Sequence, residues 1–201
     1  MKTGKQYKIC RRLGSPIYEK CQTAKFAQSV ARKGGRSDKK PKQQSDFGLQ
    51  LIEKQKVRFS YGVSEKQFSN YVEKAVETKG VPPTEKLFEL LERRLDNVVY
   101  RLGLASTRAL ARQLVSHGHI TANGRKVTIP SYQVVHGDMI SVRDGSRKSA
   151  LFTDMAKKYT TYTWPNWLTF DTEKLTGTIA GSPKNADSAL NFNAVLEYYT
   201  R

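Results

Sequence analysis

Apolar residues recur at helical spacing through the middle of the chain. Residues 50–79 form two amphipathic stretches, which are separated at Tyr61-Gly62 where the periodic pattern is interrupted. Ser64 followed by Gln67 matches a capping box, in which two backbone N–H groups at the start of a helix are satisfied. The pattern therefore predicts two helices, the second of which ends at Gly80.

A further apolar face begins after the turn signal Pro82-Pro83. Thr84 is a suitable N-cap, and leucines from Leu87 to Leu102 then occupy one face at the 3.6-residue period. Gly103 follows as the natural stop. We predict one helix from about Thr84 to Gly103, whose apolar residues belong to the core.

The pattern then changes from helix to strand. Ser106 or Thr107 is predicted to cap a short helix that runs to about Ser116. Beyond it the period becomes two, and Asn123-Gly124 is the strongest short signal for a β-hairpin, because a type I′ turn needs positive φ twice. Residues 139–142 form another short strand. This part of the chain is therefore two helices followed by a small sheet.

Composition adds a strong positive charge to this picture. The 201 residues include 35 Lys and Arg against 18 Asp and Glu, a formal charge of +17. Residues 1–48 carry 13 basic and 3 acidic side chains, whereas residues 149–201 are neutral. Such an excess favours a polyanion as the partner. No apolar run reaches the ~18 residues of a membrane-spanning helix, and the start lacks the apolar region of a secretory signal, so we expect an intracellular protein without membrane contact.

These patterns predict an α+β protein with four parts. Residues 1–45 form a basic N-terminal arm that is partly irregular, without periodicity from Ala31 to Ser45. Residues 46–91 form a helical domain. Residues 92–150 form an inserted small module of two helices packed on a short β-sheet. Residues 151–201 form a neutral C-terminal segment that packs back on the helical domain.

Basic side chains gather at the helix ends and the hairpin of this module. Arg108 and Arg112 are four residues apart, so they stack on one helix face, and the helix start at Ser106-Thr107 offers backbone N–H groups to an anion. The local sequence alone fits a solvated charged face as well as a phosphate-binding face. The basic residues concerned are Arg94, Arg101, Arg108, Arg112, His117, Arg125 and Lys126.

A resemblance decides between these interpretations. The stretch LFELLERRLDNVVYRLGLASTRALARQLVSHGHITANGRKVTIPSYQVVHGDMISVR closely resembles the RNA-binding module named after the fourth small-subunit ribosomal protein. Two further stretches, SDFGLQL and EKQKVRFSYGVSEKQFSNYVEKA, look like segments of the ribosomal protein itself, and so does the ending of the chain. Over about residues 7–201 the chain is therefore similar to bacterial-type members of the universal uS-four family.

The resemblance implies a non-enzymatic structural constituent of the small ribosomal subunit. Members of this family bind the 5′ domain of small-subunit rRNA, nucleate assembly of the subunit body and contribute to translational accuracy. The implied partners are that rRNA, the third and fifth small-subunit proteins, and mRNA near the channel by which it enters. The implied location is the cytoplasm, within the small subunit, and an organellar ribosome is the alternative. No cofactor is implied.

The resemblance also implies which residues contact rRNA. A folded RNA junction is recognised through its shape and 2′-hydroxyls, so phosphate and sugar contacts are expected to dominate. The expected residues lie in the arm, in the helical domain and in the module. They are Arg11, Arg12, Lys54, Lys56, Arg58, Arg94, Ser106, Thr107, Arg108, Arg112, Gln113, His117, Asn123, Gly124 and Lys126.

The arm departs from the pattern of the family. Many members carry four cysteines there that bind zinc, whereas only Cys10 and Cys21 are present here. A structural zinc site needs four ligands, and the three histidines all lie in the module, so we expect no metal and two packing cysteines. The family's Gly-Gln-His-Gly stretch is also missing.

Two other functions deserve comparison. Arg94-Leu95-Asp96 matches the core of the pseudouridine synthase motif, in which the Asp is a nucleophile, but the flanking residues differ and no catalytic domain remains. Asp96 is expected instead to pair with a neighbouring arginine. A free-standing RNA-binding regulator or stress protein would contain little more than the module, and the stretch at residues 53–75 argues against it.

Overall fold

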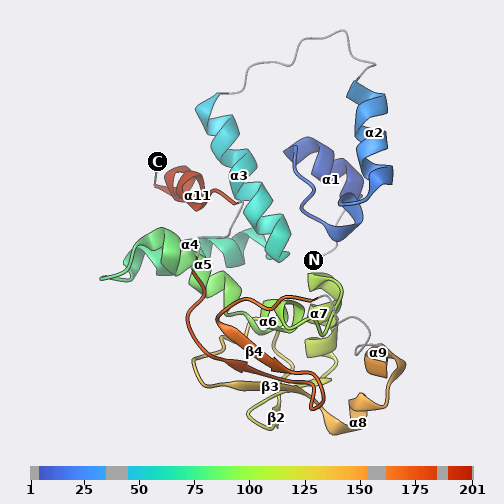
Figure 1. The fold of residues 1–201 in the computed structure, drawn as a ribbon. Helices are drawn as coiled ribbons and strands as arrows, with labels where there is room; N and C mark the ends of the chain where they lie inside the picture. Colours follow the sequence, from blue (N-terminus) through green and yellow to red (C-terminus); the bar gives the residue numbers. More distant parts are fainter. Residues whose placement is uncertain (1–4, 35–44, 154–161, 185–189, 201) are drawn as a thin grey trace. The chain divides into compact units, whose positions relative to one another are not determined.

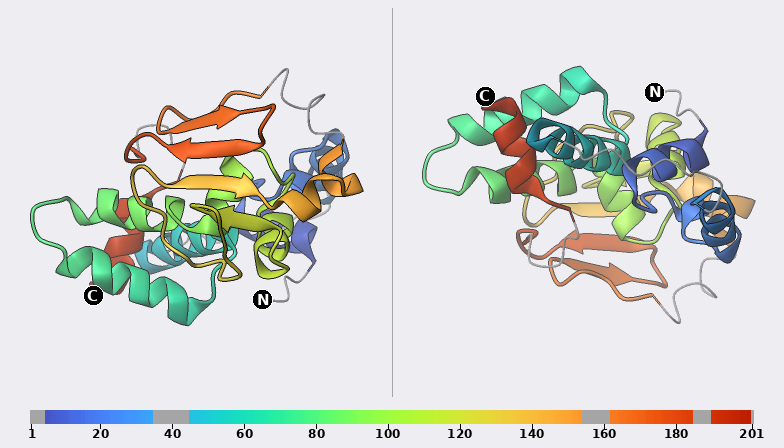
Figure 2. Two further views of the ribbon diagram at one scale, coloured as in Figure 1. Left: turned by 90° about the horizontal axis from the view of Figure 1, so that it is seen from below. Right: turned by 90° about the horizontal axis from the view of Figure 1, so that it is seen from above.

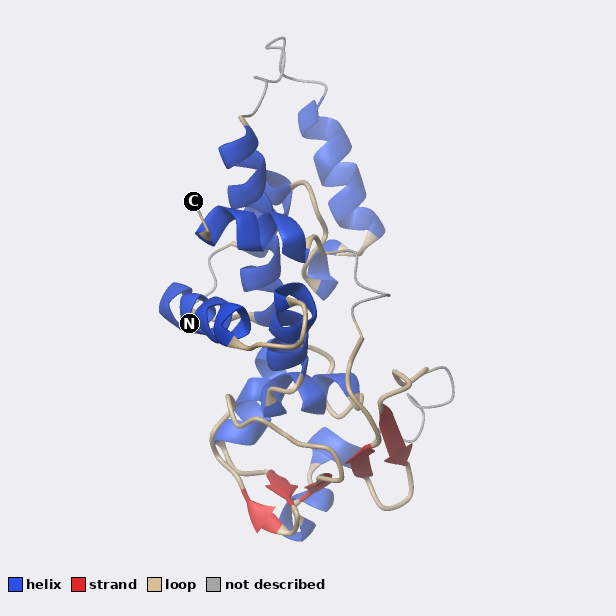
Figure 3. Cartoon of the chain, turned by 90° about the vertical axis from the view of Figure 1, so that its left-hand side faces the viewer, coloured by secondary structure: helices blue, strands red, loops and turns tan. Residues whose placement is uncertain are grey.

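The computed structural model describes residues 5–34, 45–153, 162–184 and 190–200 (Figure 1). The chain forms two compact units, of which one comprises Met1–Leu87 with Asp187–Arg201 and the other Phe88–Ala186. All described strands belong to the second unit, while the first is helical (Figure 3). Among the described residues no helix has the length and apolar character needed to cross a membrane.

The start of the first unit is more regular than its sequence suggested. It contains α1 (Gln6–Leu13), the 3₁₀ turn η1 (Glu19–Cys21) and α2 (Ala24–Gly34). The first residues of the segment expected to be irregular, 31–34, therefore lie in a helix, and residues 35–44 lie outside the described residues. The reason is a small core that local periodicity does not reveal. Its buried members are Cys10, Tyr18, Cys21 and Phe26.

The first unit also contains α3 (Asp46–Tyr61), α4 (Glu65–Glu77) and α11 (Phe192–Tyr199). The predicted capping box of α4 is confirmed, because the Ser64 hydroxyl accepts from the Gln67 N–H at 3.3 Å and Gln67 Oε1 accepts from the Ser64 N–H at 3.4 Å. The C-terminal helix α11 packs on α3.

The helix predicted from Thr84 to Gly103 is two helices, so this prediction is wrong. The chain forms α5 (Pro83–Glu92), which contains residues of both units, and then α6 (Leu95–Arg101). Between them Arg94 is extended, with φ −67° and ψ 134°, and forms a β-bridge with Gln133. Long-range pairing thus interrupts a sequence whose apolar spacing is continuous. The start at Pro83 fits the preference of proline for the first helical position.

The predicted short helix and hairpin are confirmed. The helix is α7 (Arg108–Ser116), capped by Thr107, whose Oγ1 accepts from the Leu110 N–H at 3.1 Å. The hairpin joins β1 (Ile120–Ala122) to β2 (Arg125–Lys126) through Asn123 and Gly124, with φ of 52° and 77°.

The sheet extends beyond the expected module. Its antiparallel order is β2-β1-β3-β5-β4, where β3 is Met139–Val142, β4 is Leu168–Asp171 and β5 is Thr176–Ile179 (Figure 2). Two short helices, α8 (Asp144–Arg147) and α9 (Ala150–Thr153), follow β3. Residues 168–179 were expected to pack on the helical domain, but they complete this sheet, and of the described tail only α11 packs on α3.

The core of the second unit lies between this sheet and helices α6 and α7. The alternate residues Ile140 and Val142 of β3 are buried in this core, as is Ile120 of β1. Gly177 in β5 allows Leu102 to approach, because a Cβ there would lie 2.5 Å from a Leu102 methyl carbon. Trp164 belongs to the same core and donates from Nε1 to the Leu102 carbonyl at 3.1 Å.

Candidate nucleic-acid interface

Two buried carboxylates organise the basic residues of the second unit. The side chains of Glu92 and Asp96 are 1% and 3% exposed. A carboxylate is costly to bury unless it is paired and hydrogen-bonded. Both are paired with arginines, and this pairing sets the positions of the arginine side chains.

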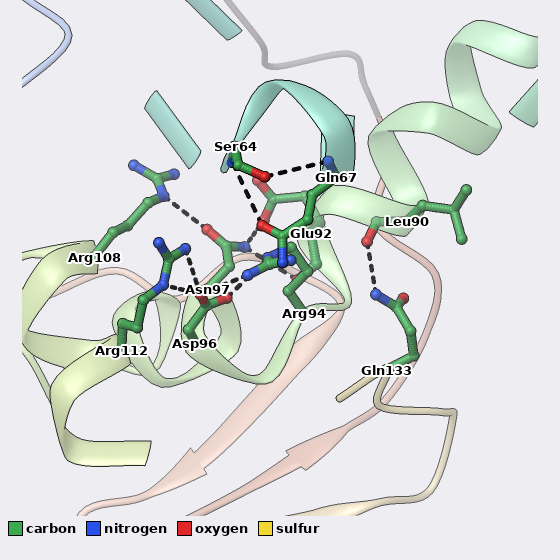
Figure 4. A network of polar contacts seen from close by, with 10 residues as sticks. All are labelled: Ser64, Gln67, Leu90, Glu92, Arg94, Asp96, Asn97, Arg108, Arg112 and Gln133. Atoms are coloured by element: carbon green, nitrogen blue, oxygen red, sulfur yellow. Dashed lines mark hydrogen bonds and ion pairs between the residues drawn. The ribbon is translucent and has the colours of Figure 1, made fainter. Parts of the chain in front are cut away.

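Asp96, in the first turn of α6, binds two guanidinium groups that approach from different elements (Figure 4). Arg94 donates from Nε to Oδ1 at 3.0 Å and from Nη2 to Oδ2 at 2.8 Å. Arg112 of α7 donates to Oδ2 from Nε at 2.8 Å and from Nη2 at 2.7 Å. The expected pairing of Asp96 with an arginine is therefore confirmed.

Glu92 organises a second set of contacts at the end of α5. Arg101 donates to it from Nε at 3.0 Å and from Nη2 at 2.8 Å, a two-pronged geometry. Asn97 donates to Glu92 Oε2 at 2.9 Å and accepts at Oδ1 from Arg108 Nε at 2.8 Å. The Arg108 guanidinium also lies over the Tyr100 ring, 4.4 Å from its centroid.

The network leaves an excess of positive charge at the surface. Four guanidinium groups surround two carboxylates, and the side chains of Arg101 and Arg112 remain 34% and 29% exposed. Arg108 is also partly exposed. Guanidinium groups held in place lose little conformational entropy when they bind a phosphate. The geometry is therefore suited to binding a polyanion.

Other expected residues line the same unit. Ser106, Gln113 and His117 are exposed on or beside α7. The side chain of Lys126, in the hairpin, packs directly against Gly118. A Cβ at Gly118 would lie only 2.1 Å from Lys126 Cε, so only glycine leaves room for the side chain in this position. Its ammonium group thus lies near the C-terminal end of α7.

Asn123 fixes the hairpin turn, of which Gly124 is the exposed second residue. The side chain of Asn123 donates from Nδ2 to Asp138 Oδ1 at 2.8 Å and accepts at Oδ1 from the Met139 N–H at 2.9 Å. These two bonds explain why an asparagine occupies the left-handed conformation at this position.

Arg94 and Lys54 do not occupy surface positions, contrary to the expectation that they contact rRNA. Arg94 is 2% exposed and Lys54 4%, since each pairs with a carboxylate of its own unit. Lys54 Nζ lies 2.6 Å from Glu65 Oε1 and 4.5 Å from the Tyr198 ring centroid. Lys54 thus joins α3 to α4, and Arg94 is bound to the first turn of α6.

The remaining expected residues of the first unit lie on α1 and α3. Arg12 is exposed and Arg11 partly exposed. Lys56 pairs with Glu53 at 2.6 Å, and Arg58 lies 3.4 Å from a Glu65 oxygen. The cations of α3 are therefore neutralised within the unit to a greater extent than the sequence indicated.

The sequence did not single out Glu92 and Asn97, which join two of the arginines. Their partners Arg101 and Arg108 lie nine and eleven residues away. Helical spacing relates residues three or four apart. The Glu92–Arg101 pair instead spans the unforeseen break at Arg94, and the Asn97–Arg108 pair joins α6 to α7. The only signal in the sequence that could have pointed to Glu92 was its charge within a stretch of apolar residues at helical spacing.

The thiols of the first unit do not fit a structural zinc site. Cys10 and Cys21 are 1% and 2% exposed, and burial, followed by the side-chain hydrogen bond with Cys10, raises the pKa of Cys21 to about 12. Zinc requires thiolates and four ligands. Within the part of the chain that the structure describes, no group of three or more His, Cys, Asp or Glu side chains could hold a metal ion.

Comparison with known proteins gives matches over nearly the whole chain. Residues 1–92 match the family model described as "Ribosomal protein S4/S9 N-terminal domain", and residues 93–140 match the "S4 domain". The second match contains Asp96 and all four arginines of the network, whereas Glu92 is the last residue of the first match.

Relatives agree with these two matches. The small ribosomal subunit protein uS4 of Syntrophomonas wolfei is 45% identical over 96% of this chain and 95% of its own. That of Acetivibrio thermocellus is 42% identical over 99% and 98%, and protein uS4A of Alkaliphilus oremlandii is 46% identical over 96% of both. Identity at this level along almost the full length shows that the chain belongs to the uS4 family of small ribosomal subunit proteins.

Proposed function

We propose that this chain is a structural constituent of the small ribosomal subunit and that it binds small-subunit rRNA directly. The observation that carries the proposal is the arginine network, in which buried Glu92 and Asp96 hold Arg101, Arg108 and Arg112 at the surface of the second unit. Phosphate and sugar contacts from such prearranged guanidinium groups suit a folded RNA.

The same network argues against catalysis at the motif shared with pseudouridine synthases. Asp96 is 2% exposed, and its two oxygens accept hydrogen bonds from Arg94 and Arg112. An aspartate nucleophile must be able to reach its substrate, and this carboxylate is buried and held by two arginines. We therefore propose a non-enzymatic role.

Similarity along the whole chain supports a finer proposal. We infer that the RNA site is the 5′ domain of small-subunit rRNA, and that binding nucleates assembly of the subunit body and contributes to translational accuracy. The neighbours would then be the third and fifth small-subunit proteins, with mRNA close by, and the location would be the cytoplasmic ribosome.

Footprinting of the purified full-length chain on protein-free small-subunit rRNA tests this proposal. Protection confined to the 5′ domain is expected, together with preference over an unrelated structured RNA of equal length at the same salt concentration. Equal affinity for both RNAs would overturn it. The chain is also expected in small subunits at near-stoichiometric amounts after a high-salt wash, and its loss in that wash would contradict the structural role.

A further inference from the structure

Asn123 is followed by glycine, and it is the only asparagine of the 201 residues with this neighbour. Asparagine side chains are thermally labile, and glycine has no Cβ to shield its backbone nitrogen from the side chain before it. Both residues are exposed in the turn between β1 and β2, and a Cβ added at Gly124 would meet nothing within 4 Å. Solvent therefore reaches a bond between two residues that are prone to react with each other.

The reaction at such a pair is an intramolecular acyl transfer. The Gly124 nitrogen loses its proton and forms a bond to Cγ of Asn123, the Cγ–Nδ2 bond breaks, and the side-chain nitrogen takes up a proton and leaves as ammonia. The product is a five-membered succinimide ring. Water then opens the ring at one of its two carbonyl carbons, which gives aspartate or its isomer isoaspartate, in which the main chain runs through the side-chain carbonyl carbon. Water is the only other reactant.

The native turn holds the reacting atoms apart. Asn123 has φ 52°, in the left-handed region, where ψ is about +30 to +60°. At such values of ψ the Gly124 nitrogen lies anti to Cβ about the Cα–C bond, whereas ring closure requires the two atoms to be nearly eclipsed. The reaction therefore needs the turn to open. The Asn123 N–H opposes this opening, because it donates to the Met139 carbonyl at 2.8 Å.

The side-chain amide of Asn123 is also held. Its Nδ2 donates to Asp138 Oδ1 at 2.8 Å, and its Oδ1 accepts from the Met139 N–H at 2.9 Å. Asp138 is 6% exposed and is itself fixed. Its Oδ2 accepts from the Val135 N–H at 2.8 Å, and its carbonyl accepts from the Ile179 N–H at 3.1 Å. The buried carboxylate thus connects the Asn123 amide to the body of the sheet.

We propose that Asn123 is a deamidation site that the native fold protects, and that Asp138 provides this protection. A hydrogen bond to a charged group is stronger than one between neutral groups, so the Asp138 carboxylate stabilises the closed turn with its amide intact. Loss of this contact, by local opening of the hairpin or by unfolding, allows the reaction. This chemistry belongs to the chain itself and does not depend on RNA binding.

The products of the reaction do not fit the native turn. Aspartate in place of Asn123 would direct a second carboxylate at Asp138 Oδ1, which now accepts from an amide at 2.8 Å, and two carboxylates at this distance repel each other. Isoaspartate would add one carbon to the main chain between β1 and β2, whose two-residue turn sets their register. Deamidation would therefore leave a lasting defect in the hairpin.

The test follows deamidation of the full chain by mass spectrometry of the peptide that contains position 123, during incubation in mildly alkaline buffer. Wild type is compared with Asp138→Ala and with the wild-type chain unfolded in urea. Asp138→Ala should deamidate about ten- to a hundred-fold faster than folded wild type, the range that corresponds to one lost hydrogen bond to a charged group. The unfolded chain should be the fastest of the three.

Gly177→Ala is the matched control, because it disturbs the same sheet at Leu102 but leaves the contacts of Asn123 in place. Circular dichroism gives the folded fraction of each variant, and rates are compared at equal folded fraction. If Asp138→Ala does not fold, Asp138→Asn takes its place in the comparison. This side chain keeps its size but has one oxygen, so it cannot accept from both Asn123 and Val135, and it should also react faster than wild type.

Three results would overturn the proposal. Deamidation of folded wild type as fast as that of the unfolded chain would show that the turn gives no protection. A rate for the Asp138 variant no higher than that of Gly177→Ala would assign the protection to the stability of the whole unit and not to Asp138. Absence of deamidation at position 123 in the unfolded chain would remove the site itself.

Discussion

Asp96 and Arg112 are joined across sixteen residues by two hydrogen bonds to the same carboxylate oxygen, 2.8 and 2.7 Å long. The pair connects α6 to α7 and at the same time fixes the direction of the Arg112 guanidinium. Exposed ion pairs contribute little to stability, but removal of one partner from a buried pair is strongly destabilising. A negative charge beside an RNA-binding surface repels phosphates. Asp96 can therefore favour RNA binding only by positioning the Arg112 guanidinium.

Asp96→Asn is therefore expected to weaken rRNA binding although it removes a negative charge. Charge alone predicts tighter binding, whereas loss of positioning predicts weaker binding, so the sign of the change distinguishes the two. The free energy of unfolding should fall by about 3 kcal/mol, the order of magnitude for a disrupted buried pair. Urea unfolding and anisotropy with the rRNA fragment, at a temperature where the variant is folded, measure both effects.

The matched control is Asp144→Asn. Asp144 belongs to the same unit, and its side chain is 93% exposed, so this substitution removes an equal charge without disturbing the network. Its affinity for rRNA should stay equal or rise slightly, and its stability should remain close to that of wild type. An affinity for Asp96→Asn at or above that of the control would refute the positioning role.

The arginines themselves should differ in their effects on stability. Arg108→Ala loses the hydrogen bond to Asn97 and the contact with Tyr100. Arg112→Ala instead removes both hydrogen bonds that Arg112 donates to the buried Asp96 carboxylate, while those from Arg94 remain. Arg112→Ala is therefore expected to lower the free energy of unfolding more than Arg108→Ala does.

Each of the two substitutions should reduce the salt slope of rRNA binding by about 0.9 if its phosphate lies on duplex RNA. Lys174→Ala is the control, because Lys174 lies in the β4–β5 turn with a side chain that is 77% exposed. Anisotropy at several KCl concentrations gives the slopes. If the salt slopes of both arginine variants equal that of Lys174→Ala, neither arginine contacts an RNA phosphate.

Local signals predicted the elements whose ends are set locally. The capping box at Ser64, the cap at Thr107 and the Asn123-Gly124 turn all satisfy their own backbone groups within a few residues. The break at Arg94 could not be predicted in this way, because its extended backbone pairs with Gln133, thirty-nine residues later. The place of the tail strands in this sheet was missed for the same reason, since β5 pairs with β3 and β4 joins the sheet through β5.

The candidate site shows the same division. Sequence located Arg108 and Arg112 on one helix face, and both lie in the network. The sequence could not distinguish surface arginines from buried ones. Arg94 is buried because it pairs with Asp96, and this pair forms where the chain leaves α5 and begins α6, a break that the sequence did not predict. The same holds for Lys54, whose burial requires Glu65 of the next helix.

Gly177 tests the close approach of β5 to the end of α6. Gly177→Ala places a Cβ 2.5 Å and 2.6 Å from the two Leu102 methyl carbons, so either β5 or the Leu102 side chain must shift. Overpacking of this kind costs about 1–3 kcal/mol of unfolding free energy. Gly145→Ala is the control, because nothing lies within 4 Å of its added Cβ. Thermal unfolding of both variants measures the difference, and equal midpoints would contradict the close packing.

Glu65 makes the stability of the first unit depend on acid. Burial by itself would raise its pKa, but hydrogen bonds from Lys54 and Tyr199, at 2.6 and 2.8 Å, outweigh burial and hold the pKa below the ordinary 4.5. A carboxylate with a lowered pKa stabilises the fold above its unfolded-state pKa and loses that contribution as pH falls through the folded value. Glu65→Gln should therefore be less stable than wild type near neutral pH, with a difference that narrows below pH 4.5. Urea unfolding over this range measures it, with exposed Glu77→Gln as the control. A difference that stays constant into acid would show that the charge of Glu65 does not matter.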